Sequence, residues 1–428
     1  MTAGALEKTW FGQPRGLTIL FLTEMWTEFS FFGMRALLVY YMTKELMFSQ
    51  THSSLVYGLY GSFVYFTPLI GGAISDRWLG RKRAVILGGS IMAAGHFMMA
   101  FPALLYPALA TIAVGNGLFL PSLPSQINLL YAEDDPRRAS AYNIYYVGIN
   151  VGAFLAPFAC GTVGEWYGWH WGFTLAGIGM VFGLIVYLAG QRYLPADIRR
   201  EAAVEHPQER ARIPTRVYLV LASVASIVVI FRAAYEQSGN TVALWADSGV
   251  DRMVHGIGAI PMTWFQSLNP LLIFLLTPLV VLYWTRQGRR GREPGEVHKM
   301  AMGAFIVGAS YAMLAAVAYF SKAGASASWL WLVAYFFVYT VGELLILPVG
   351  LGLFGRLAPP AFAATMIAAW FLASFAGNFA AGALGVLWGP LSPAAFFAAT
   401  AIVSAVAGAL LLSIAPWAQA TVSRAEQP

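Results

Sequence analysis

The sequence predicts an all-α membrane protein with twelve transmembrane helices arranged as two bundles of six. Long apolar runs recur along the whole chain, only 11% of the residues are charged, and 58% are hydrophobic. A soluble domain has about 25% charged residues. The excess of apolar residues therefore indicates that most of the chain is buried in lipid.

The apolar runs define the expected spans, because a helix needs about 20 apolar residues to cross a bilayer. Strands are excluded, since barrel segments alternate in polarity over about ten residues. The expected spans are 16–46, 53–78, 84–106, 108–131, 139–163, 171–194, 217–246, 261–284, 299–320, 328–354, 361–388 and 393–416.

The most polar stretch, PADIRREAAVEHPQERARIPTR at 195–216, separates the two sets of six spans. We therefore expect an N-terminal six-helix bundle at 1–194, a cytoplasmic linker at 195–216 and a C-terminal six-helix bundle at 217–428. Transporters built from two such halves place their substrate site between repeats.

Most of the 26 Lys and Arg residues fall in loops on one side of the expected spans. Cytoplasmic loops carry this excess, so both termini are expected in the cytoplasm. The basic residues thus set topology, and no nucleic-acid partner is expected.

Several chemistries are excluded. A single cysteine, Cys160, allows no internal disulfide, and the scattered histidines predict no metal site. GRKR lacks the glycine spacing of a phosphate loop. No nucleophile–base pair is evident, so neither a cofactor nor an enzyme activity is expected.

Charged residues within spans are costly and indicate function. They are Glu24, Glu28 and Arg35 in the first span, Arg232 and Glu236 in the seventh, and Glu343 in the tenth.

The three charges of the first span project from roughly one helix face. Glu24 and Glu28 are one turn apart, and two carboxylates this close in a low-dielectric cavity disfavour double ionisation. We expect one of them to hold a proton. The alternative is a purely structural ion-pair network.

Arg35 and Glu236 are expected at similar depth, in the outer halves of two spans that both enter from the cytoplasm. A bond between them would join the two halves as an extracellular gate. Arg232, one turn before Glu236, could instead satisfy the carboxylate within one helix.

Glu343 lies near the middle of the tenth span, in YTVGELLILPVGL. A carboxylate facing a cavity there would attract a cationic group such as an amino terminus. The alternative is a protonated side chain that only packs.

These segments also carry a family resemblance. GGAISDRWLGRKRAVILGGSIMAAG, at 71–95, resembles the loop motif of the major facilitator superfamily in the form used by proton-dependent oligopeptide transporters, the POT family. YNIYYVGINVGAF at 142–154 is similar to a second diagnostic segment. AYEQSGNT, WFQSLNPL, YTVGELLILPVGL and WFLASFAGN resemble further blocks of that family.

The resemblance implies a major facilitator fold and proton-driven import of di- and tripeptides. It implies that Glu343 holds the peptide amino terminus, and that Glu236 binds a proton and gates with Arg35. It further implies a substrate site lined by Phe31, Phe32, Tyr65, Asn150, Asn269 and Trp370. We expect a monomer in a bacterial inner membrane, with lipids, protons and a small peptide as its partners.

The first span departs from the family pattern ExxER. Thr27 and Glu28 stand where a glutamate and an arginine are usual, and Phe31 and Phe32 replace two tyrosines. Leu120 replaces a lysine, and Arg232 replaces a tryptophan. The group that holds the peptide carboxylate is therefore open, with Arg35 or Arg232 as candidates.

The loop motif Asp76, Arg77, Arg81 and Lys82 is expected to lock helices two and three on the cytoplasmic side; positive-inside topology alone is the alternative. For the whole chain, symport of nitrate or an organic anion remains a second hypothesis. An uncoupled binding or sensing protein is a third.

Overall fold

The computed structural model describes residues 9–132, 135–195, 215–256, 258–321, 326–357 and 363–425. Nearly all of the expected linker at 195–216 lies outside these residues. Contacts divide the chain into two compact units, Met1–Leu38 with Phe66–Ala202 and Val39–Tyr65 with Ala203–Pro428. The unit boundary falls inside the first two helices, and the division at the linker stays a prediction.

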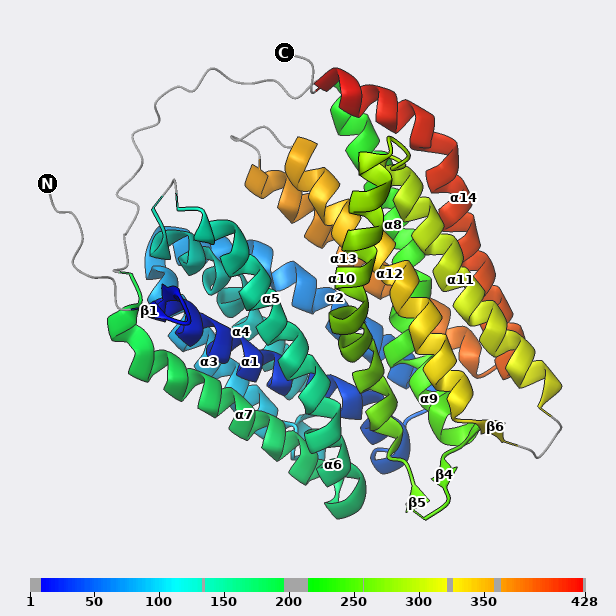
Figure 1. Ribbon diagram of the computed structural model, residues 1–428. Coiled ribbons are helices and arrows are strands. Elements are labelled where there is room, and N and C mark those ends of the chain that lie inside the picture. Colours follow the sequence, from blue (N-terminus) through cyan, green and yellow to red (C-terminus); the bar gives the residue numbers. More distant parts are fainter. Residues whose placement is uncertain are drawn as a thin grey trace, which may run out of the picture. The chain divides into compact units, whose positions relative to one another are not determined.

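The described residues form twelve long helices, which are drawn in Figure 1. They are α1 (Arg15–Tyr40), α2 (Gln50–Ile74), α3 (Arg81–Met98), α4 (Leu105–Ser122), α5 (Arg137–Ala156), α7 (Trp169–Gly190), α8 (Thr215–Tyr235), α10 (Leu268–Arg289), α11 (Glu296–Phe320), α12 (Leu330–Leu357), α13 (Ala363–Gly385) and α14 (Pro393–Ala425).

Nine helical stretches among the described residues are long and apolar enough to cross a membrane. They begin with the stretch that contains α4. The other three long helices, α1 to α3, carry more polar side chains, such as the acids of α1 and the Arg-Lys-Arg start of α3. Together they confirm the expected all-α membrane protein of twelve helices.

Short elements extend or connect these helices. Two are helices, α6 (Thr162–Tyr167) and α9 (Thr241–Ser248). Six are strands: β1 (Thr9–Trp10), β2 (Gln13–Pro14), β3 (Val250–Asp251), β4 (Met253–Val254), β5 (Gly258–Ala259) and β6 (Ala327–Ser328). π-Helical turns occur at Tyr41–Glu45, Ser75–Leu79 and Pro157–Gly161. A 3₁₀ turn at Glu236–Gly239 joins α8 to α9.

In the first unit, α3 packs against α4 and α7. Gly88 and Gly115 face each other at the α3–α4 crossing, where a Cβ atom on either would lie 2.6 Å from the other's carbonyl oxygen. Small residues of this kind let helix backbones approach closely in membranes. Gly152 likewise lets α5 approach α1 closely, because a Cβ atom on Gly152 would lie 3.1 Å from the Cβ atom of Glu28.

An antiparallel hairpin of β1 and β2 precedes α1. Its turn places Phe11 and Gly12 at φ 54° and 76°, the left-handed conformation that two-residue hairpin turns require. Tyr131 donates a hydrogen bond to Gln13 at 2.9 Å, and Arg137 donates one to the Gly12 carbonyl at 3.2 Å. These bonds fasten the hairpin to the start of α5 and the turn after α4.

In the second unit, α11 lies between α12 and α14, and α8 packs on α13 and α14 (Figure 1). Gly303 and Gly342 bring α11 and α12 together, since a Cβ atom on Gly303 would lie 2.5 Å from the Gly342 carbonyl oxygen. This close approach fixes the middle of α12, where Glu343 lies.

Residues 39–65 also belong to the second unit. The Tyr40 hydroxyl donates to the Ala243 carbonyl at 2.8 Å, and Lys44 pairs with Asp247 at 2.8 Å. Arg252 also reaches Asp247, at 3.5 Å. Further along α2, Gly58 lies against Gly382 of α13. Two segments that are far apart in the sequence therefore pack together as one unit.

Candidate functional site

Glu343 lies in the middle of α12 with only 7% of its surface exposed. Both carboxylate oxygens accept a hydrogen bond. The Tyr235 hydroxyl donates to Oε1 at 2.6 Å, and the Asn269 amide donates to Oε2 at 2.5 Å. Buried carboxylates require such partners, so these two donors hold Glu343 in one orientation.

Asn269 reaches this position from the start of α10. Its amide also approaches the Thr340 hydroxyl at 3.1 Å, one turn before Glu343 on α12. The structure thus brings together Asn269 and Glu343, two residues for which the family resemblance implies substrate contact.

Arg232 and Glu236 form a buried ion pair within one helical turn. The Arg232 Nη1 donates to the Glu236 Oε1 at 2.9 Å, and the side chains are only 6% and 4% exposed. This is the competing arrangement considered for Arg232. A gate between Arg35 and Glu236 stays a prediction.

Aromatic rings enclose the Arg232 guanidinium. It lies 5.2 Å from the ring centroid of Tyr65 and 6.0 Å from that of Tyr235, distances at which ring faces attract a cation. Gly377 of α13 makes room for its stem, because a Cβ atom there would lie 2.5 Å from the Arg232 Cβ atom. The guanidinium is therefore held in place by packing as well as by charge.

Tyr235 connects these two groups, with its ring beside Arg232 and its hydroxyl on Glu343. Its ring stacks on Tyr339, whose hydroxyl donates to the Tyr235 carbonyl at 2.8 Å. Tyr235 is not among the residues that the sequence predicts for the site. The only signal was its position between Arg232 and Glu236, two charged residues one turn apart in the sequence.

The cluster in the second unit can therefore bind a cation. It contains one positive charge, on Arg232, and two carboxylates, those of Glu236 and Glu343. When both carboxylates are ionised, the cluster therefore has one negative charge in excess. Glu343 accepts hydrogen bonds from two neutral groups, the Tyr235 hydroxyl and the Asn269 amide, which suits it to receive a ligand ammonium group.

The first unit holds a second set of acids on α1. Glu24 is buried, and Glu28 interacts electrostatically with both Glu24 and Arg35. The three charges thus lie close together, as their spacing predicts. The Tyr145 side chain of α5 adjoins both carboxylates. Whether either acid carries a transported proton stays a prediction.

Four other expected substrate residues have contacts within their own unit. Phe31 and Phe32 pack edge to face on α1, with ring centroids 5.4 Å apart. Asn150 donates to the Tyr146 carbonyl of its own helix at 2.9 Å. Trp370 packs edge to face on Phe354 of α12, at 5.3 Å between centroids. Their roles toward a substrate stay predictions.

The loop motif lies at the junction of α2 and α3. Asp76 and Arg77 are exposed in the π-helical turn. Arg81 donates to the Ser125 carbonyl at 3.4 Å, and Lys82 reaches the Leu194 carbonyl at 3.3 Å. Both basic side chains therefore contact the ends of neighbouring helical segments, and the lock between helices two and three stays a prediction.

Asp135 pairs with Arg137 at the start of α5, at 2.6 Å. The side-chain hydrogen bond from Arg137 lowers the pKa of Asp135 below its usual value. This carboxylate is thus engaged locally, next to the hairpin that Arg137 also holds.

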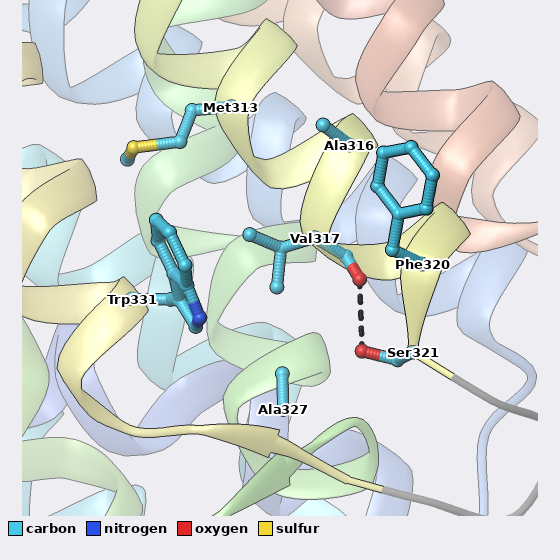
Figure 2. A pocket seen from close by; sticks show the side chains of 7 residues that line it. All are labelled: Met313, Ala316, Val317, Phe320, Ser321, Ala327 and Trp331. Atoms are coloured by element: carbon cyan, nitrogen blue, oxygen red, sulfur yellow. Dashed lines mark hydrogen bonds between the residues drawn. The ribbon is translucent and has the colours of Figure 1, made fainter.

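One pocket of the second unit is unsuited to charged ligands. Figure 2 shows it between the end of α11 and the start of α12, with Trp331 on one side and Phe320 on the other. Its described lining residues are uncharged, and the Ser321 hydroxyl donates to the Val317 carbonyl at 2.8 Å. Within the described part of the chain, no group of three His, Cys, Asp or Glu residues could hold a metal ion.

Twelve long helices with buried acids and a buried guanidinium define a polytopic membrane protein of the kind that moves solutes. The chain belongs to the POT family, because the family model described as POT matches residues 82–213 and 209–388. This confirms the family resemblance seen in the sequence.

Similar proteins include the di-/tripeptide transporter of Lactococcus lactis subsp. cremoris, 34% identical over 95% of this chain and 96% of that protein. The peptide transporter YePEPT of Yersinia enterocolitica is 31% identical, covering 88% of each chain. A crystal structure of a peptide transporter POT variant with alafosfalin matches with a TM-score of 0.88 at 32% identity, over 99% of this chain and 98% of that one.

Proposed function

We propose that this protein is a proton-coupled symporter that imports di- and tripeptides by alternating access. The observation that carries the proposal is Glu343, a buried carboxylate that the Tyr235 hydroxyl and the Asn269 amide orient within α12. The names of the relatives support peptides as the substrate class, since two of them are peptide transporters.

Glu343 binds the peptide amino terminus in this proposal. An ammonium group donates charge-assisted hydrogen bonds, which are about twice as strong as those between neutral groups. A carboxylate has about four acceptor sites, and Tyr235 and Asn269 use two of them, so the ammonium group can bind Glu343 while both donors stay in place. Phe31, Phe32, Tyr65, Asn150 and Trp370 line the rest of the substrate path.

Glu236 binds the coupling proton. Protonation removes its charge attraction to Arg232, which is 2.9 Å away, and to Arg35 in the proposed extracellular gate. Glu24 and Glu28 provide a second place for a proton, because two adjacent buried acids disfavour double ionisation.

The chain acts as a monomer in the inner membrane of a bacterium, with both termini in the cytoplasm. The gathering of Lys and Arg in alternate loops supports this orientation. The bacterial relatives support the location.

Accumulation of labelled dialanine in membrane vesicles with an imposed proton gradient tests the function. We expect gradient-driven accumulation that collapses with a protonophore and is lost in Glu343→Gln. Glu45→Gln is the matched control, because Glu45 is exposed at the end of the π-helical turn after α1. Accumulation of nitrate but not dialanine would assign the protein to the anion class, and binding without accumulation would assign it to the sensing class.

A further inference from the structure

A groove of about 410 Å³ lies between α10 and α12 in the second unit. Its volume is within the range of about 300–1,000 Å³ that is typical of small-molecule sites. Its lining is largely apolar but includes the Glu293 carboxylate and the Trp284 indole. Its lining residues do not include the loop motif, Glu343, or the acids proposed to bind protons, Glu24, Glu28 and Glu236.

The groove continues the helix face that carries Asn269. On α10, Thr277, Val280 and Trp284 line the groove, and a period of about 3.6 residues per turn places them on the same stripe as Asn269. On α12, the groove begins at Leu344, the residue after Glu343. It therefore leads from the Glu343 site toward the end of α10 that carries Arg286 and Arg289.

Two residues that line the groove, Trp284 and Leu344, each carry a group that can form a further hydrogen bond. The Trp284 Nε1 is buried and has no hydrogen-bond partner among the described residues. Pro348 lacks an N–H group, so the Leu344 carbonyl loses the helical hydrogen bond that it would otherwise accept. A buried donor and a freed acceptor thus belong to two residues that line the same groove.

The Glu293 carboxylate lines the groove, and its ion-pair partner lies beside it. The Lys299 ammonium pairs with Glu293 and lies 4.8 Å from the ring centroid of Trp284. Gly288 leaves room for the second oxygen of Glu293, since a Cβ atom there would lie 2.6 Å from it. Both charges are therefore held in defined positions beside the indole.

We propose that this groove is a second binding site for the transported peptide, occupied after the peptide leaves Glu343 and before it enters the cytoplasm. The inference rests on the proposed function and its orientation. A zwitterion matches the groups present. Lys299 and the Trp284 N–H suit the peptide carboxylate, and Glu293 and the Leu344 carbonyl suit its ammonium group.

The test compares the two faces of the membrane. Dialanine exchange is measured in right-side-out vesicles, which present the external face, and in inside-out vesicles, which present the cytoplasmic face. Trp284→Phe removes the N–H but keeps a ring for Lys299, and Glu293→Gln removes the carboxylate charge. Tyr283→Phe is the matched control, because Tyr283 is exposed and does not line the groove.

Both groove variants should raise the half-saturating dialanine concentration about threefold to tenfold in inside-out vesicles, as the loss of one hydrogen bond does. In right-side-out vesicles the value should stay within about twofold of wild type. Tyr283→Phe should match wild type on both faces. A general structural defect would change both faces together or lower the amount of protein.

Equal changes on the two faces, or no change on either, would overturn the second site while leaving the proposed function intact. Loss of co-purified phospholipid from Trp284→Phe without a face-specific change would assign the groove to a lipid headgroup instead. If the wild type fails to exchange dialanine at all, the proposed function is wrong, and the second site falls with it.

Discussion

Close packing between α2 and α13 should make Gly58 intolerant of any side chain. Ser54, Gly58 and Gly61 follow one face of α2, at the spacing of one helical turn. They lie against Asn378, Gly382 and Gly385 of α13. A Cβ atom on Gly58 would lie 2.5 Å from the Gly382 Cα atom and 2.6 Å from its backbone nitrogen.

The cost of Gly58→Ala follows from these distances. The obstructing atoms are backbone, so α13 must move by roughly 1 Å to restore the contact distance of about 3.5–4.0 Å. Overpacking of this kind costs about 1–3 kcal/mol. Alanine stabilises a helix interior by about 1 kcal/mol relative to glycine. In a single variant this gain would mask part of the stability lost to the clash.

Gly72→Ala provides the matched control, because Gly72 is on the same helix and gains the same propensity. Its Cβ atom would lie 3.5 Å from Pro121, an ordinary contact. The difference between the two variants therefore isolates the clash. Purified proteins should differ in the midpoint of thermal unfolding by about 2–10 °C, with Gly58→Ala the lower.

Equal midpoints for the two alanine variants would refute the reasoning, because they would show that α2 and α13 do not approach this closely. A second measurement is dialanine uptake per molecule of inserted protein. Uptake should fall in Gly58→Ala and stay near wild type in Gly72→Ala.

Three further predictions concern the in-span charges. Glu343→Gln should weaken dialanine binding by about 10- to 150-fold, the loss expected for a charge-assisted hydrogen bond; near-normal affinity in a titration of the folded variant would contradict the assignment. Glu236→Gln should abolish proton-driven accumulation but spare counterflow exchange, whereas equal loss of both would point to a folding role caused by leaving Arg232 buried without its partner. At least one of Glu24→Gln and Glu28→Gln should change the dependence of uptake on pH, and wild-type behaviour in both would leave coupling to Glu236 alone.

The site was only partly predictable. Glu343 and Asn269 were selected because one is a carboxylate in mid-span and both lie in family blocks, and they do meet in the structure. Tyr235 was missed, because a tyrosine in an apolar span carries no signal of its own. Trp284 was missed for the same reason, since its unsatisfied N–H becomes evident only when its surroundings are known.

The sequence by itself determined that the protein lies in a lipid membrane, how many helices it has and which family it belongs to. These follow from composition, the length of apolar runs and local motifs, none of which depends on how helices are rotated. It also placed Glu24, Glu28 and Arg35 on one face, because they share one helix with a fixed period.

Only the tertiary structure decided which partners the charges have. Glu236 could pair within its helix or with a residue far away in the sequence, and the structure shows the bond to Arg232. The two donors on Glu343 come from α8 and α10. An apolar run leaves the rotation and axial offset of its helix free, and close glycine contacts such as Gly58 on Gly382 set both.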